Sequence, residues 1–184
     1  RFHAGVTAEL EKATGARAKI AEWAMGVATK TSKLRNEGKE PTGLLAAQYA
    51  VADRLVLSKI KKALGLSNTV IMVTSAAPIS VDLLEIFASL DLRIQEVYGQ
   101  SEGTGPTTYN RPGRARFGTA GPPYPGTEVR IADDGEILLR GGNVFAGYFH
   151  EPEATAATLV DGWLHSGDLG RLEDDGMLTI TGRK

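Results

Sequence analysis

The chain has 184 residues, of which 42% are hydrophobic, enough to bury the core of one large domain or two small lobes. Lys and Arg total 21 against 22 Asp and Glu, a balance that gives no electrostatic footprint for nucleic acid or an anionic membrane. The absence of cysteine excludes disulfides and cysteine-ligated metals. No signal peptide or bilayer-spanning apolar run is visible, so we expect a cytoplasmic protein, peripheral membrane contact of a longer parent being left open.

The first third of the chain is predicted to be helical. Apolar residues recur at helical spacing over 2–33, which predicts a helix weakened near its middle by Gly15. A polar loop with helix-breaking residues follows at 36–43. A second helix is predicted over 44–64, where Gly65 ends it.

The next segments follow a strand–helix–strand order. The continuous apolar, β-branched run at 69–74 predicts a strand buried on both faces, as in a parallel sheet. A helix is predicted over 81–90 and a strand over 92–97, which completes a βαβ unit. Such sheets bind ligands beyond the carboxyl ends of their strands, which is where residues 75–78 and 98–102 lie.

The last part of the chain is predicted to be rich in short strands. Residues 103–126 are rich in Gly, Pro and Thr and are predicted to form a loop. Beyond it, two Asp-Asp-Gly sequences are typical of hairpin turns, and Pro152 suits the first turn of a helix. The strands are predicted over 128–131, 136–140, 162–168, 169–173 and 177–181, and the helix over 151–159.

These elements predict an α/β fold in two parts. Residues 1–110 form a helical and parallel-sheet part that carries the segments at the strand ends. Residues 111–184 form a mostly antiparallel, β-barrel-like part.

The segment Tyr98-Gly99-Gln100-Ser101-Glu102 combines groups that a nucleotide site needs. Tyr98 offers an aromatic face for stacking on a planar base, and Gly99 lets the backbone approach a ligand closely. Ser101 offers a hydroxyl to a phosphate oxygen, and Glu102 offers a hard oxygen ligand that suits Mg²⁺ beside phosphates. The same residues equally fit an ordinary turn at a strand end with a solvated glutamate, so this segment alone leaves both interpretations open.

Two further segments are also ambiguous when taken alone. Residues 75–78, Ser-Ala-Ala-Pro, allow a flat ring to lie against the backbone, but they also fit a plain strand-to-helix turn capped by Ser80. Asp168, in His-Ser-Gly-Asp, is the residue type that binds ribose hydroxyls, but it also fits a β-turn bonded to its own backbone. We interpret His165 as structural, since no nucleophile or second acid is evidently paired with it. The glycine-rich run at 141–148 lacks the ending of a phosphate loop and is interpreted as a tight bend.

Taken together and in this order, the motifs resemble those of the adenylate-forming superfamily of acyl-CoA synthetases, luciferases and peptide-synthetase adenylation domains. Residues 75–78 resemble the adenine-side loop, and residues 98–102 resemble the Tyr-Gly-x-Thr-Glu motif with Ser101 in place of Thr. Further matches lie at 118–126, at 135–155, at Trp163 with 166–168, and at 182–183, which opens the hinge motif. The matches follow the family order and cover nearly the whole chain, although each motif alone is weak.

Within the superfamily, the chain is most similar to long-chain fatty acyl-CoA synthetases, the bubblegum type among them, in residues 49–56, 101–106 and 163–168. The short run from 103 to 118 leaves little room for the insertion of fatty acyl-AMP ligases. The resemblance implies that ATP and a fatty acid form an acyl-adenylate with the help of Mg²⁺, and that the cosubstrate CoA then displaces AMP. The expected partners are these small molecules and flanking N-terminal and C-terminal segments of the same protein, with no nucleic acid.

The resemblance also implies roles for individual residues. Tyr98 is expected to stack on adenine opposite residues 76–78, and Ser101 to contact the α-phosphate. Glu102 is expected to bind Mg²⁺, and Asp168 with Arg183 to hold the ribose hydroxyls. Val97, which stands where many relatives have Gly, is expected to border the acyl pocket. The expected nucleotide-binding set is Ala76, Ala77, Pro78, Glu96, Tyr98, Gly99, Gln100, Ser101, Asp168 and Arg183.

Two motifs of the family are not in the chain: the Ser/Thr/Gly-rich phosphate loop, which lies upstream, and the adenylation lysine of the C-terminal domain. No catalytic set is therefore complete, and we expect the chain alone not to catalyse the reaction. Two alternatives stay open. One is another acyl- or aryl-CoA ligase of the superfamily, and the other is a non-catalytic nucleotide-binding or scaffold module.

Overall fold

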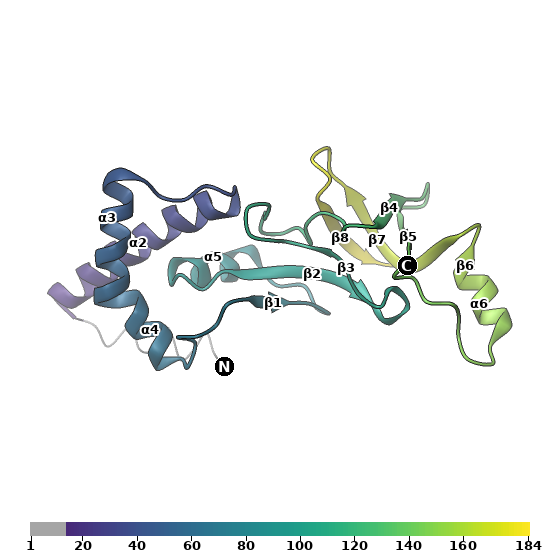
Figure 1. The fold of residues 1–184 in the computed structure, drawn as a ribbon, viewed down its shortest axis with the longest axis horizontal. Helices are drawn as coiled ribbons and strands as arrows, with labels where there is room; N and C mark the ends of the chain where they lie inside the picture. The colour runs from purple at the N-terminus through teal and green to yellow at the C-terminus, as the bar shows by residue number, and fades with distance from the viewer. Residues whose placement is uncertain (1–13) are drawn as a thin grey trace. The chain divides into compact units, whose positions relative to one another are not determined.

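The computed structural model describes residues 14–184 (Figure 1). The chain divides into two compact units: a helical unit, residues 1–72 with 82–94, and a β unit, residues 73–81 with 95–184. The sequence predicted a different division, near residue 110, between a part that carries the ligand motifs and a β-rich part. That division stays a prediction. No helix within residues 14–184 is long and apolar enough to cross a membrane.

The helical unit confirms the predicted helices where the structure describes them. Helix α2 spans Ala16–Asn36 and begins directly after Gly15, whose φ is 59°; the predicted stretch 2–13 lies outside the described residues. The predicted helix over 44–64 is observed as three consecutive pieces, of which the middle one is π-helical. These pieces and the next helix are α3 (Gly43–Ala52), η1 (Asp53–Leu57), α4 (Ser58–Ala63) and α5 (Val81–Ser89).

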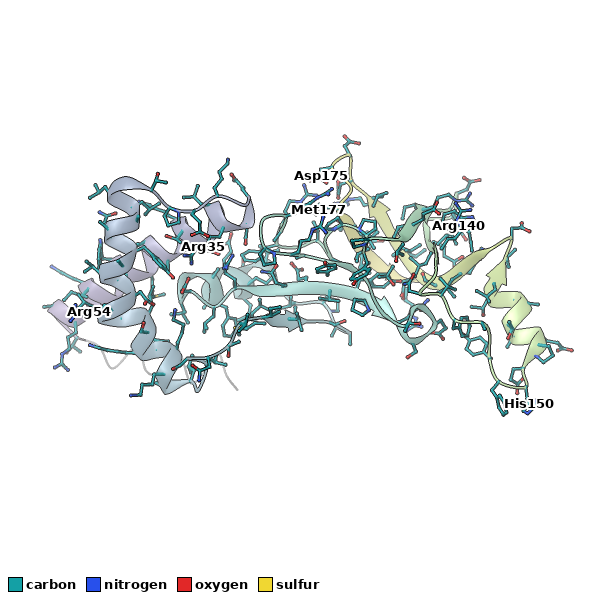
Figure 2. All side chains as sticks on the ribbon, viewed as in Figure 1. Arg35, Arg54, Arg140, His150, Asp175 and Met177 are labelled. Carbon is teal, nitrogen blue, oxygen red and sulfur yellow. The ribbon has the colours of Figure 1, made fainter. Side chains whose placement is uncertain are left out.

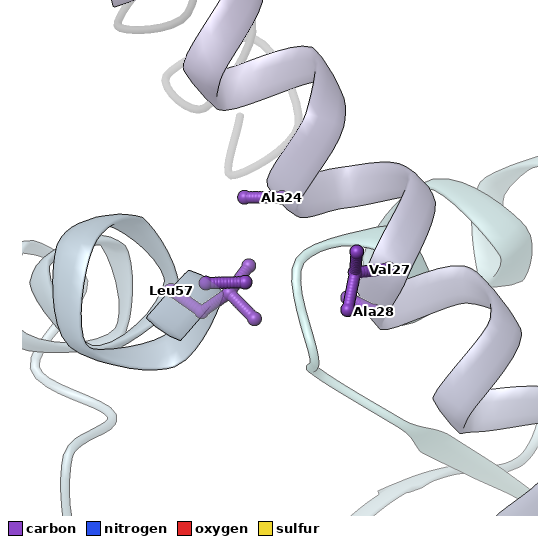
Figure 3. Close-up of a cluster of buried hydrophobic side chains, with 5 residues drawn as sticks. Ala24, Val27, Ala28 and Leu57 are labelled. Atoms are coloured by element: carbon purple, nitrogen blue, oxygen red, sulfur yellow. The ribbon is translucent and has the colours of Figure 1, made fainter. Parts of the chain in front are cut away.

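Small side chains let the helices of this unit pack closely. Ala24, Val27 and Ala28 on α2 are buried against Ala52 and Leu57. Figure 3 shows Leu57 projecting from η1 toward the labelled α2 residues. Since burial of each Leu or Val side chain contributes about 1.5–3 kcal/mol, Val27 and Leu57 are expected to contribute most of the stabilisation within this cluster.

A buried carboxylate ties several helices of this unit together. Asp91, in the turn after α5, accepts hydrogen bonds from the Tyr49 hydroxyl and Lys61 Nζ, both at 2.7 Å. Arg35 Nη1 lies 3.6 Å from its other oxygen, and only 9% of the Asp91 side chain is exposed. Two cations and a phenol from α2, α3 and α4 therefore converge on one acid.

The predicted βαβ order is observed. Strands β1 (Met72–Thr74) and β2 (Ile94–Gln100) are neighbours in a three-stranded sheet and run in the same direction in Figure 1, with α5 between them in sequence. Two details of the prediction are wrong. The run at 69–74 is not buried on both faces: β1 is short and stands at the sheet edge, and Val70 and Val73 are 93% and 62% exposed. The predicted loop at 103–126 contains a third strand.

That third strand is β3, Gly105–Tyr109, which follows a short 3₁₀ turn, η2, Ser101–Gly103. It pairs antiparallel with β2 and buries Thr107 and Thr108. Pro106 cannot donate a backbone hydrogen bond, and its place on an edge strand is where a sheet tolerates proline. The Gly and Pro content of this segment therefore marks an edge strand and its ends as well as a loop.

The β-rich part of the prediction is confirmed as an antiparallel sheet of five strands, in the order β4-β5-β7-β6 with β8 on β7. Within the described residues this sheet is open and does not close into a barrel. Both Asp-Asp-Gly turns form hairpins, and Asp175 lies in the second of them (Figure 2). The elements are β4 (Thr127–Ile131), β5 (Glu136–Gly141), α6 (Pro152–Thr158), β6 (Leu159–Val160), β7 (Trp163–Leu172) and β8 (Leu178–Arg183).

The two faces of this sheet differ in chemistry. Ile137, Leu139, Leu164 and Leu178 form a buried cluster. By contrast, the Trp163 ring carries two guanidinium groups, of Arg130 at 5.0 Å and Arg140 at 4.4 Å from its centroid. Such cation–π contacts cover the indole while the charges stay in water.

Candidate functional site

A cavity of about 340 Å³ opens within the β unit. That volume is at the lower end of the roughly 300–1,000 Å³ typical of small-molecule sites. Its walls come from the turn after β1, the strand β2, the loop after β3, and strands β7 and β8. The lining residues are 74–79, 96–100, 118–120, Asp168, Ile180 and Arg183.

The turn after β1 contributes backbone and small side chains to this cavity. Ala76 has a φ of 70°, a left-handed conformation that is uncommon outside glycine, asparagine and aspartate. Strained non-glycine conformations of this kind cost about 1–3 kcal/mol and cluster at ligand sites. Ala76, Ala77 and Pro78 all line the cavity, and their contact with a nucleotide stays a prediction.

Tyr98 connects two walls of the cavity. Its hydroxyl donates a 2.9 Å hydrogen bond to Oδ2 of Asp168, 70 residues further along the chain. Burial, together with the bond to Asp168, raises the pKa of Tyr98, so its hydroxyl stays protonated and donates. The ring also packs against the buried cluster around Leu164. Tyr98 is therefore held at both ends, with its position fixed before any ligand arrives.

Asp168 belongs to an irregular part of β7. Its side chain is 19% exposed, and Nε of Arg183 on the paired strand β8 lies 3.7 Å from Oδ1. The Arg183 side chain is 81% exposed, so this contact is a loose one that water screens. Asp168 thus presents a carboxylate with one firm hydrogen bond and remaining lone pairs toward the cavity.

Glu96 lines the cavity from β2 and is bound to the opposite wall. Its Oε2 accepts the backbone N–H of Gly118 at 2.9 Å, and Nδ2 of Asn110 lies 3.4 Å from the same oxygen. Burial raises the pKa of Glu96 to about 7, against a partial lowering by the Gly118 bond. This carboxyl group therefore changes between its protonated and ionised forms near neutral pH.

The structure gives a second reason for glycine at position 99, beyond the close approach of a ligand. A Cβ at this position would lie 1.8 Å from the carbonyl oxygen of Gly105 on β3. The β2–β3 register shifts between Tyr98 and Gly99, which brings the two backbones together at this point. Glycine is therefore required by strand pairing, whether or not a ligand also approaches.

The motif at 98–102 is split by the structure. Tyr98, Gly99 and Gln100 are part of strand β2 and line the cavity, as does Val97. Ser101 and Glu102 lie in the following 3₁₀ turn and do not line it. Oε1 of Glu102 instead accepts a 2.8 Å hydrogen bond from the Tyr148 hydroxyl.

The suitability of Glu102 for magnesium rests on its chemistry. No group of three or more His, Asp or Glu side chains able to hold a metal is found among residues 14–184. Mg²⁺ at phosphate sites is usually bound by one or two carboxylates, with substrate phosphates and water completing its shell. A single glutamate beyond the end of β2 fits that donor set, provided a polyphosphate supplies the rest.

Asn110 supports the cavity wall, although its sequence context did not indicate this role. Asn110 is 1% exposed and its Nδ2 donates to the Thr119 carbonyl at 2.6 Å, while its Oδ1 accepts from Arg116 N at 3.0 Å. It thereby fixes the loop that carries Gly118 and Thr119 to the cavity wall. No local sequence signal marks Asn110, because its role depends on the fold of a loop that lies beyond it.

A cavity formed at the carboxyl end of a strand in an α/β fold, with an aromatic ring and acids on its walls, is typical of nucleotide-binding proteins. Residues 21–149, more than half of the chain, match the family of AMP-binding enzymes. The chain therefore belongs to the AMP-binding enzyme family.

Individual relatives within the family show which proteins the chain is similar to in sequence and in structure. The chain is 42% identical over 97% of its length to the long-chain-fatty-acid–CoA ligase FadD15 of Mycobacterium bovis, and spans 29% of that protein. It is 40% identical over 95% of its length to the long-chain-fatty-acid–CoA ligase ACSBG2 of Xenopus laevis, and spans 25% of it. Among solved structures, the anthranilate CoA ligase AuaEII in complex with anthranoyl-AMP matches with a TM-score of 0.60 and 26% identity, over 64% of this chain and 25% of that one.

Proposed function

We propose that this chain is the central part of an ATP-dependent long-chain fatty acid–CoA ligase. The observation that carries the proposal is that residues 76–78, Tyr98 and Asp168, which are far apart in sequence, line one cavity. The similarity to two long-chain-fatty-acid–CoA ligases supports the choice of substrate class. Because the chain spans 29% or less of those relatives, the activity belongs to a longer protein that includes it.

The reaction has two steps. A carboxylate oxygen of the fatty acid attacks the α-phosphorus of ATP, and the bond to pyrophosphate breaks, which leaves an acyl-adenylate. The CoA thiolate then attacks the acyl carbonyl carbon, and AMP leaves with the electron pair of the broken C–O bond. Mg²⁺, when bound, neutralises charge that develops on the departing pyrophosphate. The phosphate loop and the adenylation lysine would come from segments outside this chain.

The residues of the cavity suit the nucleotide part of both steps. The Tyr98 ring, held by Asp168 and by the apolar cluster, offers a fixed face for adenine opposite the turn at 76–78. The lone pairs left on Asp168 suit ribose hydroxyls, with Arg183 beside them. Binding a rigid ligand to groups already in place loses little conformational freedom.

The remaining assignments are proposed on position and chemistry. Glu96, Gly99 and Gln100 complete the nucleotide-facing side of β2, and Val97 borders the acyl group. Ser101 would bind the α-phosphate and Glu102 the Mg²⁺ from the turn that follows the strand. Glu102, whose Oε1 accepts a hydrogen bond from the Tyr148 hydroxyl, would offer its carboxylate to the metal.

A palmitate-dependent exchange of pyrophosphate into ATP by the full-length protein tests the activity directly. Exchange with palmitate, and not with benzoate or acetate, is the expected result. The similarity to an anthranilate CoA ligase favours an aryl acid as the second candidate substrate, and exchange with benzoate alone would establish it. No exchange with any acid would point to a non-catalytic nucleotide-binding module.

Asp168→Ala tests the ribose assignment in the same protein. Loss of charge-assisted hydrogen bonds, worth about 1.5–3 kcal/mol, should weaken binding of an acyl-adenylate analogue roughly 10- to 150-fold by calorimetry. Asp133→Ala, at an exposed hairpin position that does not line the cavity, serves as the control and should bind as the wild type does. Equal affinity of wild type and Asp168→Ala would remove the assignment.

A further inference from the structure

Strand β7 is interrupted where it faces β5. Glu136 on β5 pairs with Leu169, whereas Leu138, two residues later, pairs with His165, four residues earlier on β7. Between these two pairs, residues 166–168 of β7 lie opposite the single residue Ile137 of β5, so β7 holds two extra residues there and bulges out of the ladder. A β-bulge of this kind redirects side chains and leaves backbone groups without their usual partners, and here it contains Asp168.

The buried side chain of Glu136 supplies a hydrogen-bond acceptor to the backbone of the bulge. Oε1 of Glu136 accepts the backbone N–H of Gly167 at 2.9 Å. Its Oε2 lies 3.0 Å from both His165 Nδ1 and Lys184 Nζ. Only 5% of the Glu136 side chain is exposed, so its bond to the Gly167 N–H is shielded from water, whereas water partly screens the pair with Lys184, whose side chain is 51% exposed.

Further hydrogen bonds from neighbouring residues stabilise the rest of the bulge. The backbone N–H of Lys184 donates to the Gly167 carbonyl at 2.8 Å, and the Asp168 N–H donates to Ser166 Oγ at 3.1 Å. Gly167 adopts a φ of 73°, which glycine tolerates best. Glu136 therefore binds both the centre of the bulge and the strand end that lies beside it.

We propose that Glu136 is a positioning residue, whose buried carboxylate holds the bulge at residues 166–168 so that Asp168 faces the nucleotide cavity. Glu136 does not itself line that cavity, whereas Asp168 does. It therefore acts on a ligand through Asp168. This inference rests on the proposed function, in which Asp168 binds the ribose hydroxyls of the adenylate.

The electrostatics agree with this role. Burial alone would raise the pKa of Glu136, but hydrogen bonds from Lys184, Gly167 and His165 outweigh burial and hold that pKa below its usual value. The group is thus a carboxylate, which accepts at both oxygens. In Glu136→Gln one carboxylate oxygen becomes an NH₂ donor that must face another donor. The variant therefore loses the hydrogen bonds of one oxygen, while the side chain keeps its volume.

The experiment compares two ligands on the full-length protein by calorimetry. AMP carries both ribose hydroxyls, and dideoxy-AMP lacks them while it keeps the base and the phosphate. In Glu136→Gln we expect the preference for AMP over dideoxy-AMP to fall about 5- to 10-fold, roughly the worth of one hydrogen bond. Glu128→Gln, an exposed acid on the neighbouring strand β4, is the matched control and should keep the wild-type preference.

A double-mutant cycle separates positioning from general destabilisation. If Glu136 acts through Asp168, then Glu136→Gln should have no further effect on AMP binding in the Asp168→Ala background. An unchanged preference in Glu136→Gln overturns the inference, and so does an equal weakening of AMP and dideoxy-AMP. Should Glu136→Gln fail to fold, Lys184→Met removes the ion pairs of Nζ with Glu136 and with Asp134 and leaves the Gly167 bond to Oε1 in place. A twofold or larger fall in preference that Asp134→Asn does not reproduce supports the inference; no fall, or an equal fall in Asp134→Asn, overturns it.

The wild type distinguishes the two levels of the proposal. If wild-type protein binds AMP and dideoxy-AMP equally, the ribose role of Asp168 fails, and the positioning role falls with it. If the wild type prefers AMP and Glu136→Gln keeps that preference, only the positioning role fails.

Discussion

In the helical unit the buried carboxylate of Asp91 is surrounded by Lys61, Arg35 and the Tyr49 hydroxyl. In the β unit the cavity acids Glu96 and Asp168 are each held by one short hydrogen bond. The difference separates an acid whose bonding capacity is used within the protein from one that is free to meet a ligand. The Asp91 carboxylate accepts from partly buried cations and a phenol at both oxygens and has no capacity left, whereas an acid held on one side and open to a cavity can still bind a ligand.

Asp91→Asn gives the largest expected effect and tests the structural half of this comparison. The change keeps the shape and the left-handed backbone, where φ is 60°, which asparagine also tolerates. It removes one partner from two partly buried cations, and we expect a loss of about 3 kcal/mol. This is the low end for broken buried pairs, because Lys61 and Arg35 are each 21% exposed and keep Asp53 and Glu40 as second partners. Amide hydrogen exchange in α2–α4 of the full-length protein measures it.

The control for that experiment is Glu37→Gln, which removes the exposed ion pair with Lys39 and should leave exchange unchanged. Nucleotide affinity should be the same in both variants, since neither residue belongs to the β unit. A loss of nucleotide binding in Asp91→Asn without faster exchange would contradict the purely structural role.

Gly99→Ala tests whether the cavity wall depends on backbone contact. Its Cβ would meet the Gly105 carbonyl at 1.8 Å, so β3 must move, and we expect about 2 kcal/mol of overpacking cost. Faster exchange of the β2 and β3 amides is the measurement. Gly142→Ala, where a Cβ meets nothing within 4 Å, should exchange as the wild type does. If Gly99→Ala loses nucleotide binding while its exchange is normal, the glycine serves the ligand directly.

The smallest effect concerns Glu96 and pH. Its folded pKa of about 7 is above the ordinary value of 4.5, so the folded protein holds this proton more tightly than the unfolded chain does. The resulting stabilisation is complete below about pH 4.5 and is lost as the pH rises through about 7. The thermal midpoint of the wild type should therefore fall, relative to Glu96→Gln, across that window.

Glu153→Gln, on the exposed face of α6, is the control for the pH series and should follow the wild type at every pH. Parallel curves for wild type and Glu96→Gln would mean that the carboxyl titrates at its ordinary pKa. That outcome would remove the distinction between Glu96 and a solvated acid.

Local signals explain what the sequence predicted well. Gly65, Gly135 and Gly176 all adopt positive φ and end a helix or close a hairpin, as their positions indicated. The α/β fold, the βαβ order and the antiparallel sheet followed from such signals and from hydrophobic pattern. Strand β3 was missed because Gly105 and Pro106 are typical of loops, and its pairing with β2 is decided by tertiary contact.

The candidate site, too, could be predicted only where local sequence signals mark it. Most residues that the motifs predict to bind the ligand line one cavity, while Ser101 and Glu102 lie beyond it; their binding roles stay predictions. Asn110 and Glu136 were not predicted as site residues. Their partners are set by a loop fold and by the register of two strands, neither of which leaves a local pattern in the sequence.

The pair of guanidinium groups on Trp163 has a spectroscopic consequence. The chain holds two tryptophans, Trp23 in the helical unit and Trp163 in the β unit. The indole of Trp163 emits beside two positive charges, while that of Trp23 has none of the described cation–π contacts. Each unit therefore carries its own fluorophore with a different electrostatic setting, and a Trp→Phe change at one position leaves the emission of the other as a native reporter of its unit.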